Sequence, residues 1–190
     1  HNNLLFLGKI YENTIKDSDF NYEFETTAFT RDPDYNKQWN LERVQLEPVL
    51  NSLGQDVKDV AVAVIDSGGP TPNSTAWNES NLIDGGYDFA GNDSDPTGPV
   101  NNNHGAHVAE TIAANDNVNG INGMAVRVLP LRVLGEGQTD QGIIEALKFA
   151  AGEANTSGTT YQSDAFPVAV ANMSLGGCGT SEYFCNEITN

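Results

Sequence analysis

Short apolar runs of strand length alternate along this chain with helix-type segments, and this alternation limits the possible folds more than any other feature. The runs are VAVAVI (60–65), VRVLPLRVL (126–134) and PVAVANMSL (167–175). Each is long enough for a strand buried on both faces and far too short to cross a bilayer. Helical patterns fill residues 104–114 and 139–154. Strand–helix repetition of this kind predicts an α/β fold, a three-layer arrangement with a mostly parallel sheet.

The remaining segments suggest how the chain is organised. Residues 1–31 mix polar and aromatic side chains with weak alternation, which is typical of an extended N-terminal arm or the remnant of a pro-segment. A short helix is expected over 43–54, closed by Gly54. Residues 67–103 are rich in Gly, Pro, Asn and Asp, and predict a long turn-rich insertion. Thr139 stands where the N-cap of the second helix is expected.

The charge balance limits the partners. Nine Lys and Arg face 26 Asp and Glu, a net charge of −17. This argues against nucleic acid and anionic membranes as partners. It is compatible with calcium, with cationic substrates, or simply with solubility in salty surroundings. The chain begins at His1 without Met or an apolar leader, so we expect a processed or excised product.

The two cysteines, Cys178 and Cys185, lie in the polar stretch CGTSEYFC. No second Cys pair or nearby His completes a zinc site. We expect a local disulfide in a secreted or extracellular protein, which would stabilise the fold by about 2–2.5 kcal/mol. Two free thiols in a cytosolic protein are the alternative.

Three polar elements are expected at one edge of the sheet. Asp66 follows the strand 60–65, residues 174–177 end the strand that begins at Pro167, and His104 begins a helix. Ligands bind outside the carboxyl ends of parallel strands. An Asp beside a His can fix the imidazole tautomer and make the His a general base. Each element alone has a plainer interpretation, a turn or cap Asp and a structural His.

Together these stretches resemble a known family. AVIDSGG and HGAHVAETIAA are similar to the aspartate and histidine motifs of the subtilases, the subtilisin-like serine peptidases, and NMSLGG resembles their substrate-pairing segment. DPDYNKQWNLERV and GGYDFAGNDSDP also resemble subtilase segments. The resemblance covers residues 32–190. It implies a subtilisin-like fold, incomplete in this chain, with 32–190 as the N-terminal part of the peptidase domain.

The resemblance also implies roles for individual residues. Asp66 would orient the imidazole, and His104 would be the general base. A peptide or protein substrate would pair as an added strand with one cleft wall formed by Ser174, Leu175 and Gly176. Gly135 and Gln138 would lie on the other side of that peptide. The nucleophilic Ser and the oxyanion Asn would come from the remaining C-terminal part of the domain, in a second chain or a further segment.

A structural calcium ion is a further implication of the resemblance. The loop NDNVNGI would supply the Asn117 side chain and the carbonyls of Asn115, Asn119 and Ile121, with Asn81 as a further ligand. Oxygen ligands of this kind suit Ca²⁺. A plain Asn-rich turn is the alternative.

Two departures from the family pattern keep other interpretations open. Ala106 replaces a usual Thr beside the base, and Glu110 replaces a Gly that allows close helix packing. A pseudoprotease that binds or regulates would fit these changes, although the intact Asp66 and His104 oppose it. A metal site is the other alternative, because His104, His107 and Glu110 fall at i, i+3 and i+6 of one helix. The spacing differs from the HExxH pattern of zinc proteases.

Overall fold

The computed structural model describes residues 31, 34–53, 60–71, 82–83, 85–114, 122–124, 126–135 and 139–176. Within these residues the core is a four-stranded sheet in the order β2-β3-β1-β4, and every strand pairs in parallel with its neighbour. This confirms the predicted α/β class. The strands are β1 (Ala61–Asp66), β2 (Tyr87–Asp88), β3 (Arg127–Arg132) and β4 (Val168–Asn172).

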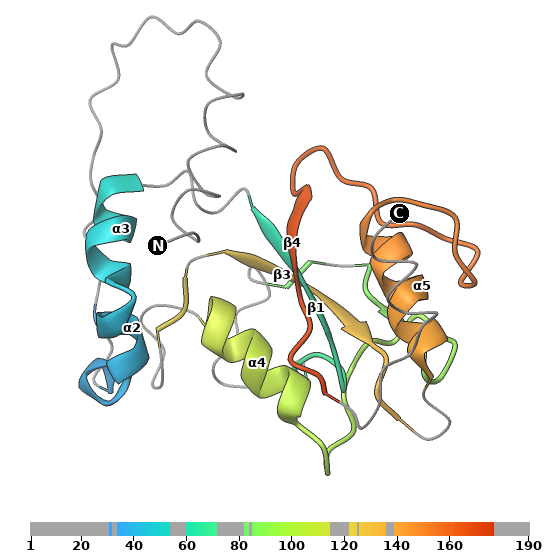
Figure 1. The fold of residues 1–190 in the computed structure, drawn as a ribbon, viewed down its shortest axis with the longest axis horizontal. Coiled ribbons are helices and arrows are strands. Elements are labelled where there is room, and N and C mark those ends of the chain that lie inside the picture. Colours follow the sequence, from blue (N-terminus) through green and yellow to red (C-terminus); the bar gives the residue numbers. More distant parts are fainter. Residues whose placement is uncertain are drawn as a thin grey trace, which may run out of the picture.

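Helices lie on both sides of this sheet. Figure 1 shows α4 and α5 on opposite sides of the strands, with α2 and α3 at one end of the molecule. The helical elements are η1 (Tyr35–Lys37), α2 (Trp39–Arg43), α3 (Leu46–Leu53), α4 (His104–Ala113) and α5 (Asp140–Ala150). A search of the described residues finds no helix with the length and apolar character needed to span a membrane.

Strand β1 is buried on both faces, as its unbroken apolar run predicts. Its alternate residues Ala61, Ala63 and Ile65 belong to the core on the α5 side, and Val62 and Val64 belong to the core on the α4 side. Because β1 lies between β3 and β4, its last residue, Asp66, lies at the middle of the sheet's carboxyl edge.

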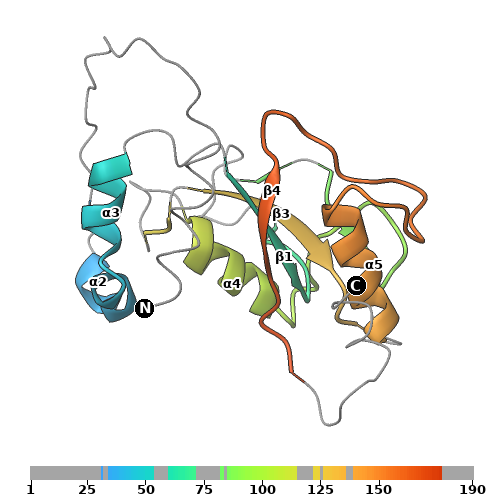
Figure 2. The ribbon, with the colours of Figure 1, turned by 45° about the horizontal axis from the view of Figure 1, so that its top comes forward.

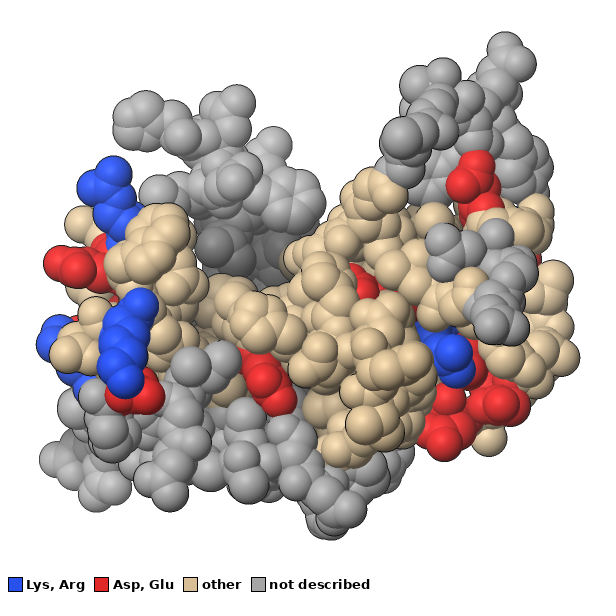
Figure 3. Space-filling view, turned by 90° about the horizontal axis from the view of Figure 1, so that it is seen from below, with Lys and Arg blue, Asp and Glu red and all other residues tan. Residues whose placement is uncertain are grey.

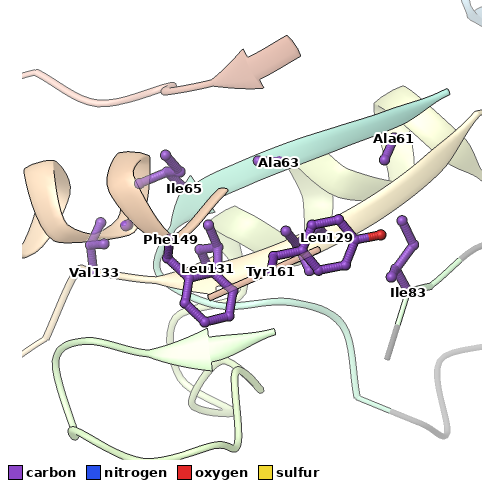
Figure 4. Packing of buried hydrophobic residues seen from close by; sticks show 10 residues of the cluster. Ala61, Ala63, Ile65, Ile83, Leu129, Leu131, Val133, Phe149 and Tyr161 are labelled. Atoms are coloured by element: carbon purple, nitrogen blue, oxygen red, sulfur yellow. The ribbon is translucent and has the colours of Figure 1, made fainter. Parts of the chain in front are cut away.

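Two apolar cores hold the layers together. On the α5 side, Leu129 and Leu131 of β3 pack with Phe149 of α5 and with Tyr161, whose ring lies along the strands in Figure 4. On the α4 side, the helix contributes the small residues Ala109 and Ala113, with Ile112 beside them. Small residues let a helix approach a sheet closely, so α4 is held near β1.

Pro130 suggests an irregular strand from the sequence, yet β3 runs through it without a break. The neighbouring backbone groups explain this, because the carbonyls of Val128 and Arg132 face β2 and accept N–H groups from that side. The backbone nitrogen of Pro130 therefore faces the same side, near Gly86, which lies outside β2. No strand there requires the N–H that proline lacks. A Cβ on Gly86 would approach the Pro130 carbonyl oxygen to 2.3 Å, so only glycine fits there.

The N-terminal helices differ in one respect from the expected single helix over 43–54. That helix is present as α3 but begins at Leu46, and α2 lies before it, separated by Gln45, whose φ of 55° no α-helix tolerates. Gly54, its expected cap, lies outside the described residues. Tyr35, Leu41 and Leu46 form their own small core. Figure 3 shows that Lys and Arg side chains gather over this end of the molecule, on the side of α2 and α3.

Candidate active site

Asp66 and His104 meet at the carboxyl end of the sheet. Asp66 is the last residue of β1 and fully buried, and His104 is the first residue of α4, with a side chain 53% exposed. Their Nδ1 and Oδ1 atoms are 2.8 Å apart. In both ribbon views the start of α4 lies beside the end of β1 (Figures 1 and 2).

This contact fixes the imidazole tautomer. An ionised carboxylate only accepts hydrogen bonds, so Nδ1 of His104 must donate to Asp66. In a neutral ring the other nitrogen, Nε2, then carries the lone pair. A buried carboxylate and a half-exposed imidazole therefore form a pair that can take a proton from a group in solvent.

The Asp66 carboxylate accepts a hydrogen bond from the backbone of the next residue. Ser67 N donates to Oδ1 over 2.6 Å. In the part of the chain that the structure describes, Oδ2 has no hydrogen-bond partner although it is buried. The carboxylate also lies at the N-terminal end of α4, where the helix dipole favours negative charge.

A second contact joins the same two elements one residue further along. Gly105 N donates to Ser67 Oγ over 3.0 Å, and both residues are buried. Gly105 also lies against Gly68, since a Cβ on it would come within 2.3 Å of the Gly68 oxygen. The end of β1 and the start of α4 are therefore packed backbone to backbone. The sequence predicts no role for Ser67, because its place directly after Asp66 does not by itself indicate the close approach of α4.

The predicted substrate walls lie on either side of Asp66. β1 stands between β3 and β4, so Gly135, which follows β3, and Ser174, which follows β4, flank it. Ser174 and Gly176 are exposed and Leu175 is half-buried. The Ser174 hydroxyl donates to the side chain of Asn172 over 2.9 Å. Residues 173–176, which continue from β4 without strand structure, therefore border the site with Ser174 and Gly176 exposed.

Several predicted site residues lie outside the described residues. They are Gln138 of the substrate wall, both cysteines, Cys178 and Cys185, and the calcium set of Asn81, Asn115, Asn117, Asn119 and Ile121. Among the described residues no group of three or more His, Cys, Asp or Glu side chains is placed to hold a metal ion. The alternative of a metal site on His104, His107 and Glu110 therefore finds no support.

The residues that depart from the family pattern are less confined than the sequence suggests. Glu110 is half-buried, so it does not occupy the tight buried position expected from the sequence. Ala106 is also half-buried. His107, to which the resemblance assigns a structural role beside the base, is exposed on the same helix. The helix packs on β1 through Ala109 instead, which is fully buried.

A turn held by a buried ion pair supports the site from the β2 side. Asp88 is 2% exposed, accepts N–H groups from Ala90 and Gly91, and pairs with Arg132. The loop that follows is hydrogen-bonded to the end of β1, where Gly69 N donates to the Pro96 oxygen over 2.8 Å. The sequence reasoning did not single out this pair.

One carboxyl group in this loop has a shifted pKa. Hydrogen bonds from the hydroxyl and the backbone N–H of Thr97 lower the pKa of Asp95, and a small desolvation effect opposes them. The backbone bond is 3.0 Å long. The folded loop therefore favours the charged form of Asp95.

Known proteins with similar sequences belong to the family that the sequence motifs resemble. Residues 57–188 match the subtilase family. The major intracellular serine protease of Bacillus subtilis is 34% identical over 134 residues, which are 68% of this chain and 38% of that protein. The halolysin-like extracellular serine protease Nep of Natrialba magadii is 32% identical over 135 residues, 67% of this chain and 24% of that protein.

The fold matches solved structures as well. A structure of proteases from Pseudoalteromonas arctica PAMC 21717 superposes with a TM-score of 0.68 at 30% identity, over 85% of this chain and 55% of that chain. The chain thus spans well under two thirds of the length of each of these proteins. Since the family match covers more than half of the chain, it belongs to the subtilase family.

Proposed function

We propose that the complete protein is a serine endopeptidase that uses Asp66 and His104 as two members of an Asp–His–Ser triad. The observation that carries the proposal is the 2.8 Å contact between His104 Nδ1 and the buried Asp66 carboxylate at the carboxyl end of the sheet. Membership of the subtilase family supports it. The nucleophilic Ser and the oxyanion Asn lie outside this chain, in the remaining C-terminal part of the peptidase domain.

The roles follow from the geometry. Nδ1 is bound to Asp66, so Nε2 of His104 accepts the proton of the serine hydroxyl as that oxygen attacks the peptide carbonyl. The imidazolium that forms is stabilised by Asp66, and it then gives its proton to the leaving amine. Burial keeps Asp66 in place, and the exposure of His104 leaves its outer nitrogen accessible.

The substrate is an extended peptide. We propose that its backbone pairs with residues 174–176 as an added strand and that Gly135 and Gln138 lie on its other side. The exposure of Ser174 and Gly176 supports this arrangement. No nucleic acid or membrane enters this proposal.

We also propose that the protein is secreted and that Cys178 and Cys185 form a disulfide. One relative is named an extracellular protease and another an intracellular one, so family membership alone does not assign the compartment. Alkylation of the native protein without reductant, read by mass spectrometry, tests the disulfide. Alkylation at both thiols would contradict it.

The experiment for the catalytic proposal is hydrolysis of casein by the complete protein, with labelling by a fluorophosphonate that reacts with activated serines. We expect both in the wild type and neither in His104→Ala, because single losses in a triad cost about 10⁴–10⁶ in turnover. His107→Ala is the matched control on the same helix and should retain activity. A folded wild type that neither labels nor hydrolyses would favour a subtilase retained for binding or regulation, the alternative that Ala106 and Glu110 raise.

A further inference from the structure

The N-terminus of α4 lacks the hydrogen bond that a helix usually gets from its own N-cap side chain. The first N–H groups of a helix have no partner within the helix, and an N-cap Asn normally satisfies one. Here the N-cap is Asn103, and its side chain makes no such bond. Asn102 Oδ1 reaches the His104 N–H only at 3.4 Å.

Ser67 supplies the cap from another element. Its hydroxyl oxygen accepts the N–H of Gly105 at 3.0 Å, across 38 residues of sequence. The same separation joins Asp66 to His104. Two parallel contacts therefore connect the last residues of β1 with the first residues of α4, one between side chains and one between a hydroxyl and a helix amide.

Ser67 also contacts the carboxylate that His104 meets. Its backbone N–H donates to Asp66 Oδ1, the oxygen bonded to His104 Nδ1. Ser67 is fully buried, and the Gly68 backbone packs directly on Gly105. One residue thus fixes the carboxylate with its backbone and the start of the histidine helix with its side chain.

We propose that Ser67 is a positioning residue that sets the distance between Asp66 and His104 by capping α4 with its hydroxyl. The inference rests on the proposed function, because it assigns Ser67 a role in the same reaction. Ser67 does not touch substrate or take a proton. It holds the imidazole where the carboxylate can orient it, and small displacements of such groups cost much of a reaction rate.

The test is a series of variants at this position in the complete protein. Ser67→Ala removes the acceptor, Ser67→Cys keeps the size but accepts hydrogen bonds only weakly, and Ser67→Thr keeps the hydroxyl. Thr111→Ala is the matched control, since it also removes one hydroxyl from α4, the one that donates to the His107 oxygen over 2.9 Å. We expect Ser67→Ala and Ser67→Cys to lower kcat by about 10- to 100-fold with KM nearly unchanged. Ser67→Thr should restore most of kcat, and Thr111→Ala should stay close to the wild type.

A second readout does not depend on activity. The hydrogen bond from His104 Nδ1 to Asp66 should give a strongly downfield imidazole proton in the NMR spectrum of histidine-labelled protein. Ser67→Ala and Ser67→Cys should weaken or lose this signal while Thr111→Ala retains it. Wild-type kcat and an unchanged proton signal in folded Ser67→Ala or Ser67→Cys would overturn the proposal, as would failure of folded Ser67→Thr to recover either. If the wild type neither hydrolyses nor labels, the catalytic proposal fails, and the proton signal alone decides whether Ser67 positions His104.

Discussion

Adding one methyl group at Gly105 perturbs the contact between β1 and α4 directly. A Cβ there would lie 2.3 Å from the Gly68 oxygen and 3.0 Å from both Asp66 Cβ and Gly68 N, whereas ordinary contacts of a Cβ begin near 3.4 Å. The crowded atoms are mostly backbone and cannot rotate away. Gly68 itself has φ +117°, a conformation that side chains rarely adopt, so this segment cannot easily shift.

Two opposing effects decide the outcome of Gly105→Ala. Alanine favours a helix over glycine by up to about 1 kcal/mol, and less near a helix end. Overpacking in a buried site costs about 1–3 kcal/mol. The overlap here is severe and falls on backbone, so the steric effect is larger, and we expect a net loss of about 1–2 kcal/mol in the free energy of unfolding. Separation of α4 from β1 by about 1 Å would also reduce turnover by up to about 10²-fold.

Gly142→Ala is the matched control for this prediction. Gly142 also lies in the first turn of a helix, α5, but the nearest atom to its added Cβ would be Phe89 Cβ at 4.0 Å. With open space and the same gain in helix preference, it should stabilise the protein by about 0.5–1 kcal/mol. Urea unfolding of both variants of the complete protein, with a serine-protease inhibitor present, measures the difference. A Gly105→Ala variant as stable and active as the wild type would refute the close approach of α4 to β1.

Three further predictions concern the surroundings of the site. The pKa of Asp95 is lowered in the folded state by Thr97, so its contribution to stability is present above the unfolded value of about 3.9 and is lost as pH falls below it. Asp95→Asn should therefore lose less stability than the wild type in acid, measured by thermal unfolding across that range. Gln38→Ala removes both side-chain bonds to the Asn122 backbone, which should cost about 1–3 kcal/mol in urea unfolding, with Gln38→Glu in between. If Asn81 and the loop 115–121 hold calcium, as the resemblance to the family implies, millimolar calcium should raise the unfolding temperature of the complete protein above its value in chelator, and equal temperatures would count against the site.

Most of the sheet could be predicted from the sequence, because the buried strands are unbroken runs of apolar residues. An unbroken apolar run such as Val62–Ile65 can lie only between two packed faces, so β1 and its neighbours were predictable. β2 was not, since a strand of two residues, Tyr87–Asp88, is too short to show a period. Gln45 separates α2 from α3 through its positive φ, which the pattern of side chains does not predict.

The candidate site also has residues that the sequence predicts and residues that it does not. Asp66 and His104 could be proposed because parallel strands end at one edge and because the motifs resemble a family. Ser67 could not, since its role depends on the precise approach of a helix to a strand 38 residues away. Glu110 shows the reverse error, because its tight packing was inferred from the family pattern and the structure leaves it half-buried.

Asp88 and Arg132 should respond unequally to the loss of either partner. Arg132→Met leaves the Asp88 carboxylate two donors, the N–H groups of Ala90 and Gly91, so we expect a cost of about 1–2 kcal/mol. Asp88→Ala instead removes the carboxylate that pairs with the guanidinium and frees both amides, and breaking a buried pair from this side costs about 3–5 kcal/mol. The Arg132 side chain is 23% exposed, so the lower end of that range is expected. The double variant should recover part of the loss in urea unfolding, because no charge stays buried. Equal costs for the two single variants would show that the amides of Ala90 and Gly91 do not stabilise the Asp88 carboxylate once Arg132 is gone.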